Sequence, residues 1–270
     1  MQKKVLITGS TDGIGLGAAK ALAAQGHHLL LHGRSQVKLE DAQQVVSAVS
    51  SSGEVEAYLA DFSNLSDVVK LAKDISHKHH RIDVLINNAG IFKTSNSITQ
   101  DGFDVRFVVN TIAPYLLTRD VLPLLGDRGR VVNLSSAAQS PVDLEAMLGH
   151  KKLDDMQAYA QSKLAIVMWS NHMATTLKGA GIVVVSINPG SLLATKMVKE
   201  GFGMDGHDVG IGSDIIVRAC TSKEFASASG LYFDNDARRF AHPHPDALDE
   251  KKNKKVVETV ESIIDNIWLD

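Results

Sequence analysis

The order of apolar runs and helix-period segments constrains this chain more than any other feature of its sequence. The apolar runs are KVLIT (4–8), HLLLH (28–32), VEAYLA (55–60), DVLINNA (83–89), RVVNLS (130–135) and IVVVSIN (182–188). Segments with helical periodicity cover residues 14–25, 35–51, 64–80, 101–125, 155–178 and 207–220. Buried strands that alternate with amphipathic helices indicate a parallel sheet with right-handed crossovers. We therefore predict a doubly wound, three-layer α/β/α fold, with a last strand at 229–234 and a terminal helix at 254–268.

Composition limits the class of protein. With 270 residues and 44% hydrophobic content, the chain can bury a large core, and no linker or composition shift divides it, so one domain is expected over 1–270. The net charge of -3, with bases scattered among acids, argues against nucleic-acid and anionic-membrane partners. Cys220 is the only cysteine, no apolar run reaches membrane-spanning length, and a buried-strand pattern begins at Val5. A cytoplasmic location is therefore expected.

The first predicted strand runs into a glycine-rich turn, TGSTDGIGLG. Glycines let the backbone approach a pyrophosphate, and the following helix start offers free N–H groups and a positive dipole end. A dinucleotide is expected here. Its predicted contacts are Gly9, Ser10, Thr11, Asp12, Gly13, Ile14 and Gly15.

The ends of the next two strands bear on the choice of dinucleotide. An acid at the second strand end would favour NAD, but this chain has Gly33 and Arg34 there, which suit a ribose 2′-phosphate. NADP(H) is therefore favoured over NAD(H), although Asp12 stands where a second base would help. At the third strand end, beside Phe62, the Asp61 carboxylate is predicted either to accept from the adenine amino group or to cap the next helix.

Polar and glycine residues also follow the later strands. NNAG at 87–90 places Asn87, Ala89 and Gly90 either beside the cofactor ribose or among amides that brace loops. NLSSAAQ places Ser135 and Ser136 at the same sheet edge, and INPGS adds Pro189 and Gly190. Tyr159 and Lys163 lie four positions apart on a helix, so they share one face.

Six features in order make the chain resemble the short-chain dehydrogenase/reductase family. They are TGxxxGxG at 8–15, NNAG at 87–90, Asn110, the serine after the fifth strand, YxxxK at 159–163 and NPG at 188–190. The resemblance implies a Rossmann fold with its cofactor half at about 1–130 and its catalytic half at about 131–270. It also implies a carbonyl or alcohol as the small-molecule substrate.

The resemblance further implies four catalytic roles. Tyr159 is the general acid/base, and Lys163 is its electrostatic partner and a ribose ligand. Ser136, preferred to Ser135, donates to the carbonyl oxygen, and Asn110 organises a proton-relay water. The expected activity is an NADP(H)-dependent carbonyl reductase or alcohol dehydrogenase. The alternative is an NADPH-binding sensor without turnover, and a second is an isomerase or dehydratase that holds NAD tightly.

Two segments depart from the general pattern of the family. The interval between Ser136 and Tyr159 is long and resembles that of retinol-dehydrogenase-like members, so residues 137–158 are predicted to wall the substrate pocket or to form a neutral surface loop. Residues 191–210 are predicted to cover the substrate, with Thr195 reaching the nicotinamide carboxamide.

Other motifs carry no assigned chemistry at this level. HKHH at 77–80 lies at a helix end without a completing acid or cysteine, so no metal is predicted there. His242 and His244 in HPHP are expected in a rigid turn near the pocket rim or at an oligomer contact. A homodimer or homotetramer through the helices of 101–125 and 155–178 is left open against a monomer.

Overall fold

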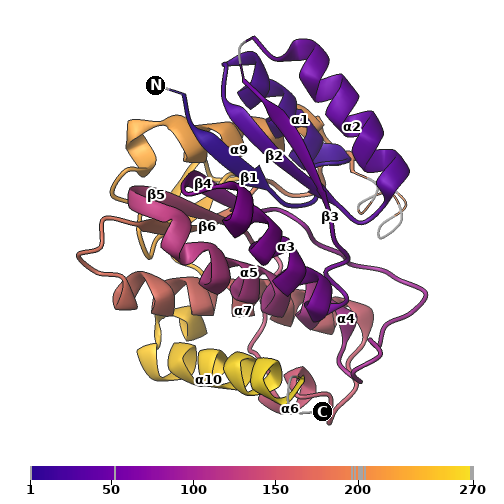
Figure 1. Ribbon diagram of the computed structural model, residues 1–270. Coiled ribbons are helices and arrows are strands. Elements are labelled where there is room, and N and C mark those ends of the chain that lie inside the picture. The colour runs from indigo at the N-terminus through magenta and orange to yellow at the C-terminus, as the bar shows by residue number, and fades with distance from the viewer. Residues whose placement is uncertain are drawn as a thin grey trace.

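A computed structural model gives the fold, and it describes residues 2–51, 53–195, 197, 199, 203 and 205–267. Its sheet has the strand order β3-β2-β1-β4-β5-β6-β7-β8 (Figure 1). Every neighbouring pair up to β7 is parallel, and β8 is antiparallel to β7. The predicted doubly wound α/β fold is confirmed.

The strands lie close to the predicted apolar runs. They are β1 (Lys4–Ile7), β2 (His28–Gly33), β3 (Val55–Leu59), β4 (Ile82–Asn87), β5 (Leu125–Leu134), β6 (Val183–Asn188), β7 (Tyr232–Asp234) and β8 (Arg239–Ala241). β5 begins five residues before its apolar run, because polar GDRG pairs irregularly where the register shifts between Ile82 and Val84 of β4. β8 has only three residues, too few for an alternation of apolar and polar side chains to be recognised in the sequence.

The helices begin at polar caps. The main ones are α1 (Gly13–Ala24), α2 (Gln36–Val49), α3 (Leu65–Lys78), α5 (Ala113–Val121), α7 (Asp155–Thr176), α9 (Val209–Thr221) and α10 (Glu250–Ile267). The short ones are α4 (Val105–Phe107), η1 (Val108–Ile112), η2 (Leu122–Leu124), α6 (Leu144–Met147), η3 (Lys223–Phe225) and η4 (Pro245–Leu248). Side-chain oxygens of Asp12, Asn64 and Asp154 accept from the first backbone N–H groups of α1, α3 and α7.

The helix predicted over 101–125 differs from expectation. Asp104 caps its start, so the helical turn begins at Val105, and a π-helical segment, η1, interrupts it before α5. A π-helical turn contains about one residue more than an α-helical turn, and this extra residue cannot be recognised from the spacing of apolar residues in the sequence. Such segments are rare and often lie at functional sites.

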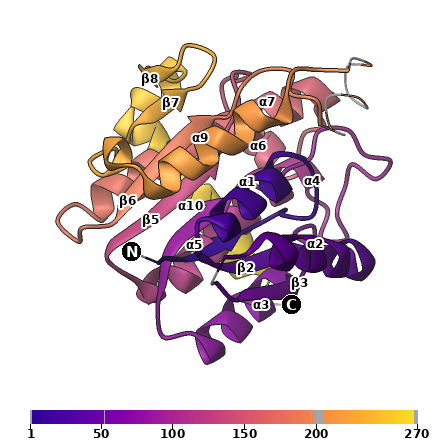
Figure 2. The same cartoon turned by 90° about the horizontal axis from the view of Figure 1, so that it is seen from above.

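Two apolar clusters cover the two faces of the sheet. One joins the sheet to α1, α2 and α9, and the other joins it to α3, α5 and α7. Figure 2 shows these helices on opposite sides of the strands. α10 forms an outer layer over α7. Alternate residues of each strand enter opposite clusters, as in Leu6 against Val5 and Ile7, so the sheet is buried on both faces.

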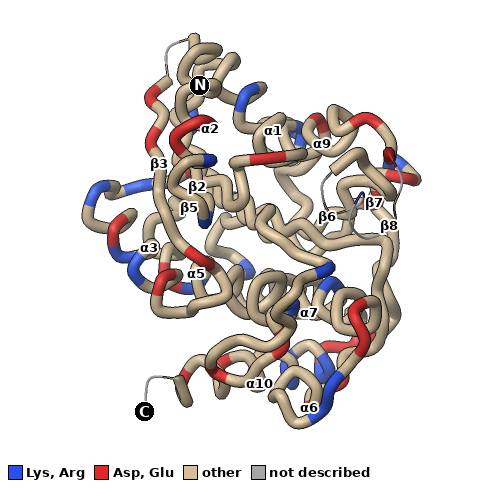
Figure 3. Tube along the Cα trace, turned by 90° about the vertical axis from the view of Figure 1, so that its right-hand side faces the viewer, with Lys and Arg blue, Asp and Glu red and all other residues tan. Residues whose placement is uncertain are grey.

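The surface carries charges of both signs. Lys and Arg are interspersed with Asp and Glu along the chain (Figure 3). Among the described helices, none has both the length and the apolar character needed to cross a bilayer.

Candidate active site

A cavity of about 610 Å³ opens at the carboxyl ends of the parallel strands. It lies around the ends of the adjacent strands β1 and β4. From β1 the chain continues to β2 and β3 on one side of the sheet, and from β4 it continues to β5 and β6 on the other side. Ligands bind at positions where the winding of such a sheet reverses. Its lining includes these predicted residues: Gly9, Thr11, Asp12, Gly13, Ile14, Gly15, Arg34, Asp61, Phe62, Ala89, Gly90, Ser136, Tyr159, Lys163, Pro189, Gly190 and Thr195. Ser10, Asn87 and Asn110 are not part of the lining.

The glycine turn after β1 leaves no room for side chains. Gly9 has φ +63, and a β-carbon there would lie 2.8 Å from the Cα of Ala89. A β-carbon at Gly15 would lie 2.4 Å from Asn88 Nδ2 and from the Gly9 carbonyl. Asn88 Nδ2 also donates to the Thr8 and Gly9 carbonyls, both at 2.9 Å. The turn is thus held in one shape, with its backbone open to the cavity.

A buried histidine that the sequence analysis did not select supports this turn. The Gly9 N–H donates to His32 Nδ1 (3.2 Å), so Nε2 carries the proton and donates to the Ala60 carbonyl (3.0 Å). Burial lowers the pKa of His32 to about 4, so the ring is neutral at physiological pH. Its ring stacks on Phe62 at 4.4 Å between centroids. His32 therefore links the ends of β1, β2 and β3 without adding charge.

Arg34 lines the cavity beyond the end of β2. Asp12 accepts from the Gly13 N–H at 2.7 Å as the cap of α1, and Lys38 Nζ lies 4.0 Å from its carboxylate. Lys38, on the first turns of α2, thus places a second base beside the loop. Asp61 accepts from the N–H and hydroxyl of Ser63, whereas Asn64 caps α3.

Tyr159 and Lys163 lie on the cavity side of α7. The Lys163 ammonium is 5.8 Å from the Tyr159 ring centroid and donates to the Leu134 carbonyl at 2.8 Å. Burial lowers the pKa of Lys163 to about 8. Burial raises the pKa of Tyr159, against a smaller opposing effect of the Ser136 hydrogen bond. The phenol is therefore neutral near pH 7, and a buried cation lies near its ring.

The structure separates the two serines that follow β5. Ser135 is buried, and its hydroxyl donates to the Lys163 carbonyl at 2.6 Å, so it fastens α7 to the sheet. Ser136 is less buried and lines the cavity with Tyr159, and its hydroxyl is the group that opposes the effect of burial on the pKa of the phenol. Of the two serines, Ser136 is therefore the one whose hydroxyl acts on the phenol.

Asn110 and Asn87 act inside the protein. Asn110 accepts from the Ile91 N–H (2.8 Å) and donates to the Ile91 carbonyl (3.0 Å) and to Ser162 (2.9 Å). It lies in η1 and ties the loop after β4 to α7. Asn87 donates to Thr118 and Asn133 in the core. For the NNAG amides, the sequence left open a place beside the cofactor ribose or a role in bracing loops, and the Asn87 contacts are of the second kind. Asn88, the next residue, lines the cavity.

The turn after β6 is braced from the turn between β7 and β8. Asp236 accepts from the N–H and hydroxyl of Ser191, and Asn188 Nδ2 donates to it at 2.9 Å. Gly190, at φ +124, continues this turn. A β-carbon at Gly13 would lie 3.4 Å from the Thr195 methyl, so Thr195 faces the glycine turn.

The two predicted substrate segments contribute unequally. Of 137–158, only Ala137, Ala138 and Met156 line the cavity, because α6 turns its apolar side chains into the core beneath α10. Only the two ends of this segment therefore reach the cavity, and whether it walls the substrate pocket or forms a neutral surface loop stays a prediction. The segment 191–210 lines the cavity with Ser191, Leu192, Leu193, Thr195 and Met197. Residues 196, 198, 200–202 and 204 of this segment lie outside the described residues.

Apolar side chains form a large part of the cavity lining. They include Ile91, Phe92, Val109, Met156, Leu192 and Leu193, of which Phe92 packs edge-on against the Tyr159 ring at 5.1 Å. Phe92 was not predicted, because a lone aromatic after NNAG has no pattern that separates a cavity wall from a core position.

A family model described as short chain dehydrogenase matches residues 3–205, which include the glycine turn, the two serines, Tyr159 and Lys163. The chain belongs to this family. As a short-chain dehydrogenase it is an oxidoreductase of a family that uses NAD(P)(H).

Similar proteins extend over most of this short-chain dehydrogenase. Human retinol dehydrogenase 13 is 30% identical over 94% of this chain and 82% of its own length. Human polyprenol dehydrogenase is 33% identical over 73% of this chain and 62% of its own length. Among solved structures, an uncharacterised protein from Mycobacterium paratuberculosis has a TM-score of 0.80 at 25% identity and covers 97% of this chain and 92% of its own. A short chain dehydrogenase from Burkholderia cenocepacia in complex with NADP has a TM-score of 0.70 at 25% identity, covering 86% and 95%.

The residues of this short-chain dehydrogenase fit a dinucleotide. The positions at which a β-carbon would clash, Gly9, Gly15 and Gly33, border the cavity where a pyrophosphate and ribose need close backbone approach. The start of α1 directs free N–H groups toward the same space.

Proposed function

We propose that this short-chain dehydrogenase is a cytoplasmic, NADP(H)-preferring enzyme that interconverts an aldehyde or ketone and the corresponding alcohol. The meeting of Ser136, the neutral Tyr159 phenol and the buried Lys163 ammonium in one cavity, with that ammonium 5.8 Å from the phenol ring centroid, is the observation that carries this proposal. The apolar wall supports a substrate with a hydrophobic body next to its carbonyl.

A bound nicotinamide supplies or accepts the hydride. In the reductive direction, Tyr159 gives its proton to the substrate oxygen, on which negative charge develops, and the Ser136 hydroxyl donates a hydrogen bond to the same oxygen. The Lys163 cation stabilises the phenolate that remains, because opposite charge favours the ionised form. In the oxidative direction, the phenolate accepts the proton of the alcohol.

Asn110 and Ser135 act as positioning residues in this proposal. Asn110 holds the Ile91 backbone and Ser162, one turn from Tyr159, and Ser135 holds the carbonyl of Lys163. Both contacts fix where α7 lies against the cavity. A relay water next to Asn110 would return the proton to Tyr159.

The preference for NADP(H) rests on charge and space at the end of β2. Arg34 lines the cavity, Gly33 leaves room beside it, and Lys38 adds a second base next to Asp12. The likeness to a solved relative that binds NADP agrees with this assignment.

The test combines cofactor titration with turnover. Purified protein is titrated with NADPH and NADH by fluorescence, and oxidation of NADPH is then followed with a panel of aldehydes and ketones of increasing apolar size. We expect NADPH-dependent turnover that the Tyr159→Phe variant loses by roughly 10²- to 10⁴-fold in kcat, with NADPH affinity within about twofold of the parent. Tight NADPH binding without turnover across the panel would favour the sensor alternative, and binding of neither cofactor would refute the proposal.

A further inference from the structure

A second cluster of ligand-type atoms lies at the opposite edge of the sheet. His28 begins β2, Glu54 immediately precedes β3, and Glu56 lies within β3. The cavity, in contrast, borders His32, Gly33 and Arg34 at the other end of β2. No step of the proposed reaction uses the cluster.

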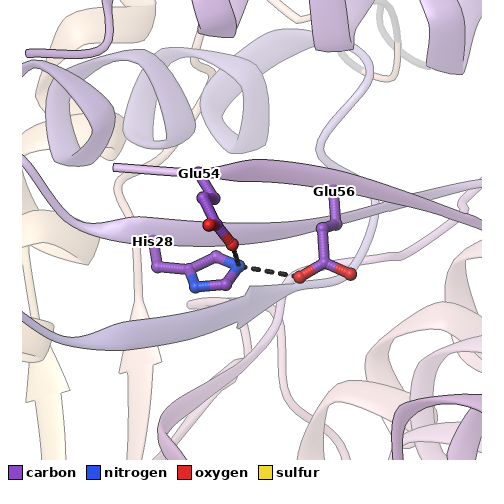
Figure 4. Close-up of side chains that lie close together, drawn as sticks. All are labelled: His28, Glu54 and Glu56. Carbon is purple, nitrogen blue, oxygen red and sulfur yellow. Dashed lines mark hydrogen bonds and ion pairs between the residues drawn. The ribbon is translucent and has the colours of Figure 1, made fainter. Parts of the chain in front are cut away.

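The strand geometry explains why these three side chains meet. Glu54 and Glu56 are two positions apart on one extended segment, so they point to the same side of the sheet. The β2–β3 register pairs Leu30 with Glu56, which places His28 opposite Glu54 on that same side. Figure 4 shows the two carboxylates converging on the His28 ring from one strand while the ring comes from its neighbour.

The three ligand atoms are close enough to share one ion. His28 Nε2 lies 2.8 Å from Glu56 Oε1 and 3.8 Å from Glu54 Oε2, and the three ligand atoms lie within 4.8 Å of one another. Ligands at about 2.0–2.2 Å from a zinc ion are separated by similar distances. His28 and Glu56 are largely buried, whereas the Glu54 side chain is 82% exposed, so the site is open to solvent on one side.

A chain of hydrogen bonds orients Glu56 from behind. Lys4 Nζ donates to His79 Nδ1 (2.9 Å), which leaves His79 Nε2 protonated and donating to Tyr58 Oη (2.9 Å). Tyr58 in turn donates to Glu56 Oε2 (2.9 Å), so Oε1 is the oxygen that faces His28. Outer contacts of this kind orient metal-binding carboxylates.

This chain also gives the HKHH tract a place. Its His79 is buried at the end of α3, and its protonated Nε2 lies 3.4 Å from Glu56 Oε1. It positions the carboxylate and does not offer a free lone pair to an ion. Glu56, the acid that His79 contacts, comes from β3, so it cannot be recognised as a partner of HKHH from the local sequence.

We propose that His28, Glu54 and Glu56 form a binding site for a single divalent ion of the zinc class, with solvent completing the coordination. Imidazole together with two carboxylates favours such an ion over magnesium, which prefers oxygen ligands and retains its water. The two carboxylates offset the charge of the ion. The site is independent of the cofactor cavity.

Calorimetric titration of chelator-treated, full-length protein with Zn²⁺ tests the proposal. We expect one site per chain that excess Mg²⁺ does not displace. Glu54→Gln keeps the shape of an exposed side chain and should weaken Zn²⁺ binding about tenfold or more, and Glu56→Gln should weaken it further. Zn²⁺ should also raise the melting temperature of the parent by more than that of Glu54→Gln at the same metal concentration.

Glu145→Gln is the matched control. It removes the carboxylate from the exposed His150–Glu145 pair (2.9 Å), which has the same residue types, and it should leave the Zn²⁺ affinity unchanged. If the parent binds no Zn²⁺, or if Glu54→Gln, Glu56→Gln and the control bind it as tightly as the parent, then His28 only donates a hydrogen bond to Glu56 and the proposal is overturned.

Discussion

The charge of Lys163 depends on its surroundings. Its ammonium is buried between the end of β5 and the Tyr159 ring, and the Leu134 carbonyl is a neutral acceptor. Burial favours the neutral amine, so the pKa falls to about 8. The proposed catalyst therefore has a cation below that pH and loses it above.

This pKa predicts a pH dependence of reduction. The kcat/KM for a carbonyl substrate should fall as pH rises through about 8, because the phenolate left by proton transfer loses its stabilising charge. In Lys163→Arg the guanidinium stays charged, so the fall should move to higher pH even if the maximal rate is lower. Steady-state rates from pH 6 to 10 measure both profiles. Identical profiles for the two proteins would assign the fall to another group.

Arg34 and Lys38 predict the cofactor preference. Arg34→Asp should weaken NADPH binding roughly 10- to 100-fold, because a charge-assisted contact with the 2′-phosphate becomes repulsive, and should change NADH binding much less. Lys38→Gln should give a smaller loss in the same direction, since this side chain is exposed and already pairs with Asp12. Fluorescence titration with each cofactor measures the ratio. Equal losses for NADPH and NADH would show that Arg34 does not read the phosphate.

At the scale of elements, the ends of β1, β2 and β3 support one another. His32 bonds to Gly9 and Ala60, and Thr11 of the glycine turn fills the space above Gly33. A β-carbon at Gly33 would lie 2.4 Å from the Thr11 methyl. The shape of the turn after β1 therefore depends on the residue that ends β2.

A double-mutant cycle measures this dependence. Gly33→Ala should push Thr11 into the cavity and weaken NADPH binding about tenfold, in line with the usual cost of crowding a packed contact. Thr11→Ser removes the methyl and should restore most of the loss in the double variant, giving a positive coupling energy. Additive effects in the cycle would mean that the two residues do not act through this contact.

The elements also show how far sequence reasoning reaches. The helix around 155–178 and the first six strands follow from the order of short apolar runs and helix-length segments along the chain. Tyr159, Lys163 and the glycine turn can be selected because they lie at fixed positions after those strands. His32, Asn88 and Phe92 cannot, because their roles depend on contacts with residues of other strands. The π-helical segment around Asn110 is set by the hydrogen bonds of Asn110 to the Ile91 backbone, which no local pattern encodes.

At the scale of the whole molecule, α10 covers the helices that were considered from the sequence for a homodimer or homotetramer interface. It packs along α7, and its Glu261 accepts from Tyr115 and from Arg119 on α5. Asn171 of α7 donates to the Ala247 carbonyl just before α10. These contacts favour a monomer over the homodimer or homotetramer that the sequence left open.

This arrangement predicts the effect of removing α10. Wild-type protein should sediment as a monomer, and a chain ending at residue 249 should associate or lose solubility, because the apolar face that receives Val256, Val260, Ile263 and Ile264 becomes exposed. Glu261→Gln is the milder variant and should stay monomeric with a slightly lower melting temperature. Sedimentation velocity across a concentration range decides the matter, and a wild-type dimer would contradict the prediction.

The segment between Leu193 and His207 is closed at its base. These two residues form a parallel bridge, and the backbone of His207 bonds to both Leu192 and Ala194. The residues proposed for proton transfer are anchored elsewhere, after β5 and on α7. Changes at Met197, which lines the cavity between these two bridged ends, are therefore expected to alter substrate selectivity while Ser136, Tyr159 and Lys163 stay in place.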